Sequence, residues 1–294
     1  MELILTNKNG QTLDLLNNDR YFILSNAQGL HGLDTDIATA ESPYLDGTIV
    51  ENVKALPRGI SLTFKLVPNI KEAIDFFTSI VKTKQYVTLT ETENGKTIVI
   101  KGIATIPPYT RMSAMCEIQL DIYCGQPYWE DIGTIVGDIS STLPRLYFPY
   151  ETGQYFTPVN GYYGGRVFSV VDTALEKTFT NDGDVAVGIK ITIIALAEVS
   201  NPTIYCSTGE QNGNYMKLNL TLSGNDEVVI NTTRGNKYIT INGSDTYDGQ
   251  PVLSYLEFKG NDWLQMETGD NTFNITAEPS DEIYFTISFK RRWE

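Results

Sequence analysis

Alternation of apolar and polar residues dominates the chain and predicts a mainly β protein. The segments 216–222 (MKLNLTL) and 282–289 (EIYFTISF) place every second, apolar residue on one face, and the shorter segments 228–230, 238–241 and 273–277 share the pattern. Half-buried antiparallel strands produce this period because successive side chains of a strand point to opposite faces. Turn clusters such as SGND and NGSD separate the segments. Short strands at this spacing are typical of a β-sandwich or a barrel.

One segment has helical periodicity instead. Apolar residues recur at helical spacing from Ile70 to Val81 and predict a helix over about 69–83. Asn69 is the expected N-cap and Glu72 stands at the capping-box position. Strands are predicted on both sides of this helix, at 60–66, 86–91, 97–103 and 115–123. We therefore expect residues 1–132 to form an α+β domain in which one helix packs against a sheet.

A shift in composition divides the chain. A length of 294 residues suits two domains, and the segment 125–165 is rich in Pro, Gly and Tyr. We expect residues 133–166 to be a connection and residues 167–294 to be an all-β domain. The aromatic residues around the connection suit a seam between domains, an interface between subunits or a platform for glycans. They are Tyr128, Trp129, Tyr147, Phe148, Tyr150, Tyr155, Phe156, Tyr162 and Tyr163.

Charge and composition exclude several kinds of partner. The formal net charge of −14 argues against broad contact with nucleic-acid phosphates or with anionic lipid. The longest apolar run, 191–197, is far shorter than the ~20 residues of a membrane-spanning helix. No charged leader followed by an apolar block opens the chain, so no signal peptide is predicted. We expect no membrane insertion.

Few residues suggest chemistry. His31 is the single histidine, and the three cysteines imply no disulfide framework, since Cys116 and Cys124 fit one face of one strand as small core residues. The chain has no Walker loop, GxGxxG, CxxC or HExxH motif. The NDGD turn at 181–184 lacks the full spacing of a calcium loop. We therefore predict no catalytic, cofactor-binding or metal-binding residue, and no enzyme.

The order of features resembles the distal tail protein (Dit) family of siphophages and prophages of Gram-positive bacteria. The first half contains SPYLDG (42–47), ALPRGISLTFKL (55–66) and DIYCGQPYWED (121–131). The second half contains an Asn-x-Gly-Asp turn, an Asn-Pro pair at the start of a strand, the strand 226–232 (DEVVINT) and a Gly-Asp-Asn turn. The family-pattern positions, for which the resemblance implies structural roles, are Asp46, Gly47, Arg58, Pro127, Asn181, Gly183, Asp184, Asn201, Pro202, Gly269, Asp270 and Asn271.

The resemblance implies a fold and a structural function. The first domain would be a split-barrel-like sheet with one helix that builds a hexameric ring, single or stacked, and the second a galectin-like β-sandwich. The ring would lie at the virion tail tip, after synthesis in the host bacterial cytoplasm. It would join the tail-tube protein to the tail-associated lysin or spike and to receptor-binding or baseplate proteins. Six copies would carry a charge of about −84, which would let DNA pass through the lumen without binding.

Two other functions stay open at this stage. A non-catalytic, carbohydrate-binding β-sandwich used in attachment to the host cell wall would need exposed rings beside polar groups, near Trp263 or Tyr162. A glycosidase would need two carboxylates in one cleft, and nothing in the sequence selects such a pair.

Overall fold

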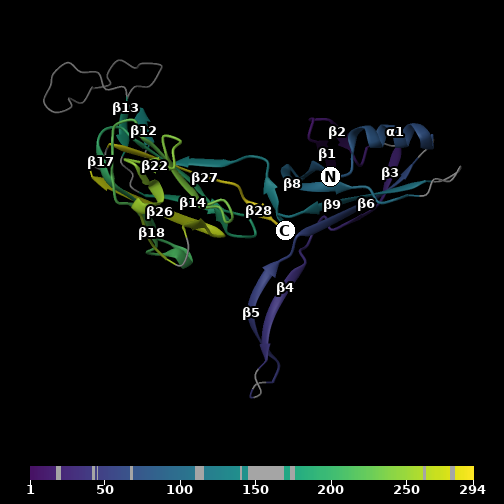
Figure 1. Ribbon diagram of the computed structural model, residues 1–294, viewed down its shortest axis with the longest axis horizontal. Coiled ribbons are helices and arrows are strands. Elements are labelled where there is room, and N and C mark those ends of the chain that lie inside the picture. Colours follow the sequence, from purple (N-terminus) through teal and green to yellow (C-terminus); the bar gives the residue numbers. More distant parts are fainter. Residues whose placement is uncertain are drawn as a thin grey trace, which may run out of the picture. The chain divides into compact units, whose positions relative to one another are not determined.

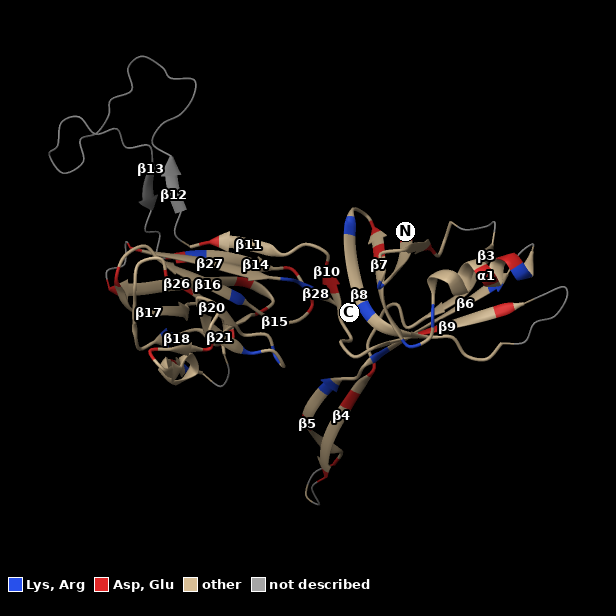
Figure 2. Ribbon diagram, turned by 45° about the horizontal axis from the view of Figure 1, so that its top comes forward, with Lys and Arg blue, Asp and Glu red and all other residues tan. Residues whose placement is uncertain are grey.

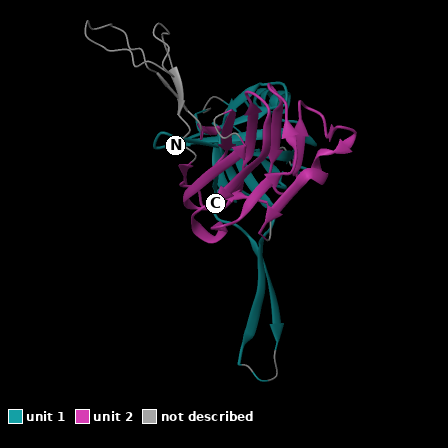
Figure 3. Ribbon diagram, turned by 90° about the vertical axis from the view of Figure 1, so that its left-hand side faces the viewer, with its two compact units in different colours: residues 1–133, 292–294 teal, residues 134–291 magenta. Residues whose placement is uncertain are grey.

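Two compact units make up the part of the chain that the computed structural model describes. The described residues are 1–17, 21–41, 44, 46–66, 69–109, 116–139, 141–144, 169–172, 176–260, 263–278 and 282–294. The first unit contains residues 1–133 and 292–294, and the second contains residues 134–291 (Figure 3). The chain thus passes into the second unit and returns to the first. No helix of the described residues is both long and apolar enough to cross a membrane.

An antiparallel sheet forms the body of the first unit (Figure 1). Its strand order is β2-β1-β7-β8-β9-β6-β3, and β10 pairs with β8 and with β28. The strands are β1 (Glu2–Asn7), β2 (Thr12–Asp14), β3 (Phe22–Gln28), β6 (Arg58–Leu66), β7 (Gln85–Glu93), β8 (Lys96–Thr105), β9 (Glu117–Cys124), β10 (Trp129–Asp131) and β28 (Arg292–Trp293). Alternate residues of β1, β6, β7, β8 and β9 are buried in one core, as the period of two predicts.

The single α-helix of the described residues, α1 (Ile70–Ile80), packs on this core. Phe77 is fully buried, and its ring centroid lies 5.9 Å from that of Phe22 and 5.4 Å from that of Phe64. The helix ends three residues before the expected residue 83, because Val81 is already extended and buried against the core. The expected capping box does not form: the Asn69 side chain makes no cap bond, and its amide donates to the Glu72 carboxylate at 3.4 Å.

A two-stranded hairpin stands apart from the large sheet. Strands β4 (Thr35–Glu41) and β5 (Thr48–Ala55) pair with each other and, among the described residues, with no other strand (Figure 1). We call these two strands the arm. The Leu56 N–H donates to the Asp34 carbonyl oxygen at 2.8 Å and closes the foot of the arm.

The second unit is a β-sandwich. One sheet has the order β11-β27-β16-β20-β21, and the other has the order β14-β26-β17-β18-β24 with β19 beside β17. Apolar residues from both sheets form one core, which shows that the sheets pack face to face. The strands of the first sheet are β11 (Ile135–Asp138), β27 (Ile283–Phe289), β16 (Lys190–Ala195), β20 (Glu227–Asn231) and β21 (Tyr238–Ile241). Those of the second are β14 (Glu176–Asn181), β26 (Gly269–Glu278), β17 (Val199–Cys206), β18 (Tyr215–Leu218), β24 (Leu256–Lys259) and β19 (Thr221–Leu222).

Short elements complete the second unit. They are the strand pairs β12 (Ser141–Pro144) with β13 (Ser169–Asp172), β15 (Val187–Gly188) with β25 (Gln265–Met266) and β22 (Thr246–Tyr247) with β23 (Gln250–Pro251), and the 3-10 helices η1 (Gly209–Gln211) and η2 (Val252–Tyr255). The predicted strand 216–222 is split into β18 and β19, which pair with separate parts of β17 on either side of its irregularity at residues 201–202.

The predicted mainly β fold with one helix is confirmed. The finer likenesses, split-barrel and galectin, stay predictions, and so does the division at 132/133 and 166/167. Strands β11 and β12 fall within the expected connection 133–166, and residues 145–166 lie outside the described part of the chain. The aromatic residues from Tyr147 to Tyr163 lie there as well.

Candidate functional site

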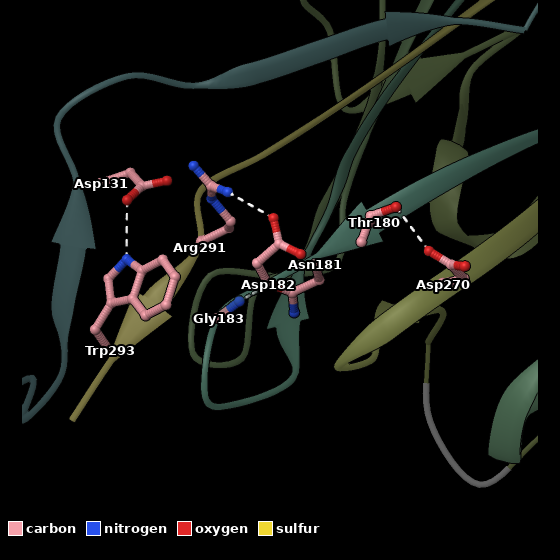
Figure 4. Close-up of polar contacts among 8 residues, drawn as sticks. All are labelled: Asp131, Thr180, Asn181, Asp182, Gly183, Asp270, Arg291 and Trp293. Atoms are coloured by element: carbon pink, nitrogen blue, oxygen red, sulfur yellow. Dashed lines mark hydrogen bonds and ion pairs between the residues drawn. The ribbon is translucent and has the colours of Figure 1, made fainter. Parts of the chain in front are cut away.

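Two of the sequence motifs meet at one end of the sandwich. Strand β14 pairs with β26 in antiparallel register, which places Asn181 opposite Gly269 and Thr180 opposite Asp270. We call residues 181–184 and 267–271 the paired turns. The Thr180 hydroxyl donates to Asp270 Oδ1 at 2.7 Å and bridges the two strands (Figure 4).

Asn181 closes the first of the paired turns from inside. Its side chain is buried, and its amide nitrogen donates to the carbonyl oxygens of Val185 at 3.1 Å and Met266 at 3.2 Å. Its Oδ1 accepts a hydrogen bond from the Gly183 N–H at 3.1 Å. Asp184 is exposed. The side chain therefore satisfies its own turn and ties that turn to the strand segment that precedes the second turn.

Asn271 closes the second of the paired turns through hydrogen bonds of its side chain to the turn backbone. Its amide nitrogen donates to the carbonyl oxygens of Glu267 at 2.7 Å and Gly269 at 2.9 Å, and its Oδ1 accepts from the Glu267 N–H at 2.9 Å. Gly269 has a φ of 85°, a left-handed conformation that favours glycine. Outside the turns, Arg291 Nη1 lies 3.0 Å from Asp182 Oδ2 in an ion pair (Figure 4).

We expect Asn271→Ala to lower the free energy of unfolding by about 2 kcal/mol, because it removes three hydrogen bonds that a buried side chain makes to the backbone of the turn. Urea denaturation followed by circular dichroism measures the change. Asn236→Ala is the matched control, because Asn236 is exposed and its loss should cost less than about 0.5 kcal/mol. Equal stability of the two variants would contradict a structural role for the Asn271 amide.

The Asn-Pro motif shapes a different strand. Asn201 and Pro202 occupy an irregularity in β17, where the pairing with β26 shifts between Ser200 and Thr203. Asn201 has a φ of 52°, and its N–H donates to the Leu220 carbonyl oxygen at 2.9 Å. Proline has no N–H to give to a ladder, so the shift in register accommodates Pro202. Like the paired turns, the Asn-Pro motif therefore shapes the backbone of its strand.

In the first unit, Arg58 and Pro127 form a buried contact. The Arg58 side chain is 5% exposed, and its Nε donates to the Pro127 carbonyl oxygen at 2.6 Å. Its Nη1 donates to the carbonyl oxygens of Gly29 at 3.1 Å and Leu30 at 2.5 Å. The indole N–H of the fully buried Trp129 donates to the same Leu30 oxygen at 2.8 Å. Arg58 and Trp129 thus hold the segment that leads into the arm.

Burial sets the electrostatics around Arg58. It lowers the pKa of the Arg58 guanidinium, an effect that the nearby Cys124 and Glu294 oppose. Cys124 lies opposite Arg58 in the β6–β9 register, and burial raises the pKa of its thiol to about 11, with the guanidinium opposing. Two buried atoms in this unit, Arg58 Nη2 and Glu91 Oε2, have no hydrogen-bond partner. Glu91 Oε1 lies 3.7 Å from His31 Nε2.

Asp46 and Gly47 lie at the tip of the arm. Both are exposed, and Gly47 has a φ of 91° as the turn reverses the chain. The structure thus brings together Arg58 with Pro127, and the two turns of the second unit with each other. The other motif residues lie elsewhere: Asn201 and Pro202 are in β17, and Asp46 and Gly47 are at the tip of the arm. Among the described residues, no group of three or more His, Cys, Asp or Glu side chains could hold a metal ion.

Comparison with known proteins finds a similarity for the second half of the chain. Residues 182–293 match the family model of the siphovirus-type tail component, C-terminal domain. This part of the chain is therefore similar to that C-terminal domain. No curated protein sequence matches the chain. The crystal structure of the SPP1 Dit protein, a paradigm of the hub adsorption apparatus in phages that infect Gram-positive bacteria, is 11% identical over 98% of each chain, with a TM-score of 0.62.

Two baseplate structures are also similar. They are the phage P2 baseplates in the activated conformation with Ca and with Sr, each 11% identical over 98% of this chain and 97% of theirs, with a TM-score of 0.43. The likeness to SPP1 Dit extends the common fold to the whole length of the chain. The resemblance found in the sequence is thereby confirmed for the tail-component domain and for the fold.

Some structural residues escaped prediction. Arg292 Nη2 donates to Glu130 Oε1 at 3.0 Å. The Trp293 indole N–H donates to Asp131 Oδ1 at 2.9 Å (Figure 4). Lys96 Nζ lies 2.9 Å from the centroid of the Trp293 ring. The only sequence signal for these contacts is the RRW run at 291–293, which follows β27. Nothing in that run tells which strand it joins.

Proposed function

We propose that this protein is a structural component of the virion tail, a distal tail protein whose copies form a hexameric ring at the tail tip. The ring, single or stacked, would be the hub that joins the tail tube to the tail-associated lysin or spike and to receptor-binding or baseplate proteins. The observation that supports this proposal is the match of residues 182–293 to the siphovirus tail-component domain, set in a fold that resembles SPP1 Dit from end to end.

The use of the motif residues favours a scaffold over an enzyme. Asn181, Asn271 and Arg58 are buried, and most of their polar atoms bond to backbone of the chain itself. Such groups shape turns and strand ends and are not presented to a substrate. We therefore propose no catalytic role and no cofactor for this protein.

Charge is compatible with passage of DNA through the ring. Figure 2 shows Lys and Arg on several separate elements of both units, and the chain as a whole has a formal charge of −14. Binding to phosphate backbones depends on clustered basic residues. We propose that DNA moves through the lumen without specific contacts.

Carbohydrate binding is the less supported alternative. Trp263, one ring considered for a glycan platform, is partly buried against the core of the sandwich. Lys237 Nζ lies 5.7 Å from its ring centroid, in cation–π geometry. This ring is therefore engaged within its own unit. Tyr162 lies outside the described residues.

We expect the purified chain to assemble into particles of ~200 kDa, six times the 32.8 kDa chain. Light scattering coupled to size-exclusion chromatography gives this mass, and negative-stain images should show rings with an open centre. A chain that stays monomeric at high protein concentration contradicts the proposed function. A glycan array provides the second arm of the experiment, since binding without assembly would support the alternative.

A further inference from the structure

Side chains of the first unit hold the short strand β28 in place. Strand β28 pairs with β10 and places Trp293 opposite Trp129. The Trp293 indole N–H donates to the buried Asp131 at 2.9 Å. Lys96 Nζ lies 2.9 Å from the centroid of the Trp293 ring, in cation–π geometry. A strand of two residues makes few backbone hydrogen bonds, so its attachment to β10 depends on these side-chain contacts.

Strand β10 also contacts the root of the arm, a name that we give to residues 29 and 30. The indole N–H of Trp129 donates to the Leu30 carbonyl oxygen at 2.8 Å. Arg58 Nη1 donates to the same oxygen and to the Gly29 carbonyl oxygen. Its Nε donates to the Pro127 carbonyl oxygen, two residues before Trp129. Trp129 therefore belongs to the strand that pairs with β28 and binds the root of the arm directly.

Charge and close packing make the root sensitive to changes around it. Glu294, the residue directly after β28, lies near enough to Arg58 to oppose the lowering of the pKa of its guanidinium. The Gly29 backbone passes so close to β6 that a Cβ on this residue would lie 2.1 Å from the Gly59 carbonyl oxygen. Closely packed groups transmit displacements to their neighbours. A change at β28 should therefore reach the root of the arm.

A short connection ties β28 to the last strand of the sandwich. Strand β27 ends at Phe289 and β28 begins at Arg292, so only Lys290 and Arg291 lie between them. The three residue steps from Phe289 to Arg292 span at most about 11 Å. Arg291 is itself engaged, because its Nη1 lies 3.0 Å from Asp182 Oδ2. The length of this connection therefore limits where β28 can lie.

We propose that β28 is a strap that fixes the root of the arm through β10, so that the mobility of the arm depends on residues 292–293. The strap keeps β10 in place, Trp129 and Arg58 hold the root, and the root leads into β4. Release of β28 should loosen the root and let the arm move more freely. This inference concerns a single chain and does not depend on the proposed ring.

Amide hydrogen exchange tests the strap. Trp293→Ala removes the ring and the N–H donor that hold β28, and it should speed exchange of the β4 and β5 amides by about tenfold or more. The Leu56 N–H, which donates to the Asp34 carbonyl oxygen, is the reporter at the foot of the arm. Strands β1 and β7, which pair with neither β10 nor β28, should keep wild-type protection.

Two variants serve as controls for this experiment. Tyr86→Thr removes a ring that is 69% exposed in the same unit and should leave exchange of the arm at the wild-type rate. Trp293→Phe retains an aromatic ring and loses only the hydrogen bond to Asp131 and part of the ring area, so its effect should be smaller than that of Trp293→Ala. It also provides the measurement should Trp293→Ala fail to fold.

The length of the connection is tested separately. Deletion of Lys290 shifts β28 by one position, which turns its side chains to the opposite face. Exchange of the arm should then rise as in Trp293→Ala, although no residue that contacts β10 has changed. Lys290→Ser keeps the length and should leave the arm at the wild-type rate. Circular dichroism and light scattering are recorded for every variant, so that folded species of equal mass are compared.

Three results would contradict the strap. The first is an arm that exchanges at the wild-type rate in Trp293→Ala while β10 loses its protection. The second is an equal increase across the whole first unit, since this would show a general loss of stability. The third is wild-type exchange of the arm after deletion of Lys290, because the placement of β28 would then not matter. Assembly of the wild-type chain into rings, or its failure to assemble, leaves each of these results unchanged.

Discussion

Trp129→Ala should lower the free energy of unfolding of the first unit by about 3–5 kcal/mol, the range for deletion of a buried aromatic side chain. The ring is fully buried, so its loss leaves a cavity in the core of the first unit. It also removes the indole donor at 2.8 Å from the Leu30 oxygen. Urea denaturation, with hydrogen exchange to assign the loss to residues 1–133, measures the effect.

Two further variants separate packing from hydrogen bonding. Trp129→Phe retains most of the volume but loses the N–H donor and a small part of the ring, so it should cost about 1–2 kcal/mol. Ile132→Ala, at a 62% exposed site three residues away, should change stability by less than about 0.5 kcal/mol. If Trp129→Phe and Trp129→Ala were equally destabilising, packing would not be the main contribution of this residue.

Arg58→Met should lower the free energy of unfolding by about 2–4 kcal/mol, because the carbonyl oxygens of Gly29 and Pro127 lose their guanidinium donors in a buried site. Methionine keeps much of the apolar length of the side chain, so the loss reports mainly on polar contacts. Arg58→Met also removes a buried charge and with it part of the desolvation cost of folding. The loss of stability should therefore be smaller than the summed contributions of the lost hydrogen bonds. Chemical denaturation measures it.

Arg58→Lys tests whether the planar shape of the guanidinium group, with its several N–H donors, is needed. One ammonium group is a compact point charge and does not reproduce the planar fork that contacts residues 29, 30 and 127, so this conservative change should be nearly as costly as Arg58→Met. Lys65→Met is the control, because its side chain is 58% exposed on the same strand. Wild-type stability of Arg58→Lys would show that charge, and not directed hydrogen bonds, holds the root of the arm.

Half-buried strands and the amphipathic helix could be predicted from local sequence. Strand β21 coincides with the predicted 238–241, and β27 differs from 282–289 by one residue. One side of each strand faces a core, so the alternation of residue types records burial directly. The helix was predicted too long because Val81 continues the apolar spacing, although it is buried in extended backbone.

Pairing between distant strands could not be predicted. Asn181 and Gly269 were each recognisable as turn residues, but their adjacency depends on the pairing of β14 with β26, which local periodicity does not encode. The sequence also does not show whether a strand face of the arm is covered. Ile37 and Val53 alternate with polar neighbours as they would in a strand covered by its own domain, and only the tertiary structure shows that the face is open.

The return of the chain to its first unit has a consequence for biosynthesis. Trp293 pairs with Trp129 and Arg292 with Glu130, so the strand that completes this sheet edge leaves the ribosome only after the entire sandwich has been translated. Until then β10 offers unpaired backbone groups to any nascent neighbour. If a chaperone covered that edge during translation, or if few ribosomes translated the same mRNA at once, β10 would pair less often with neighbouring nascent chains. More subunits would then remain soluble.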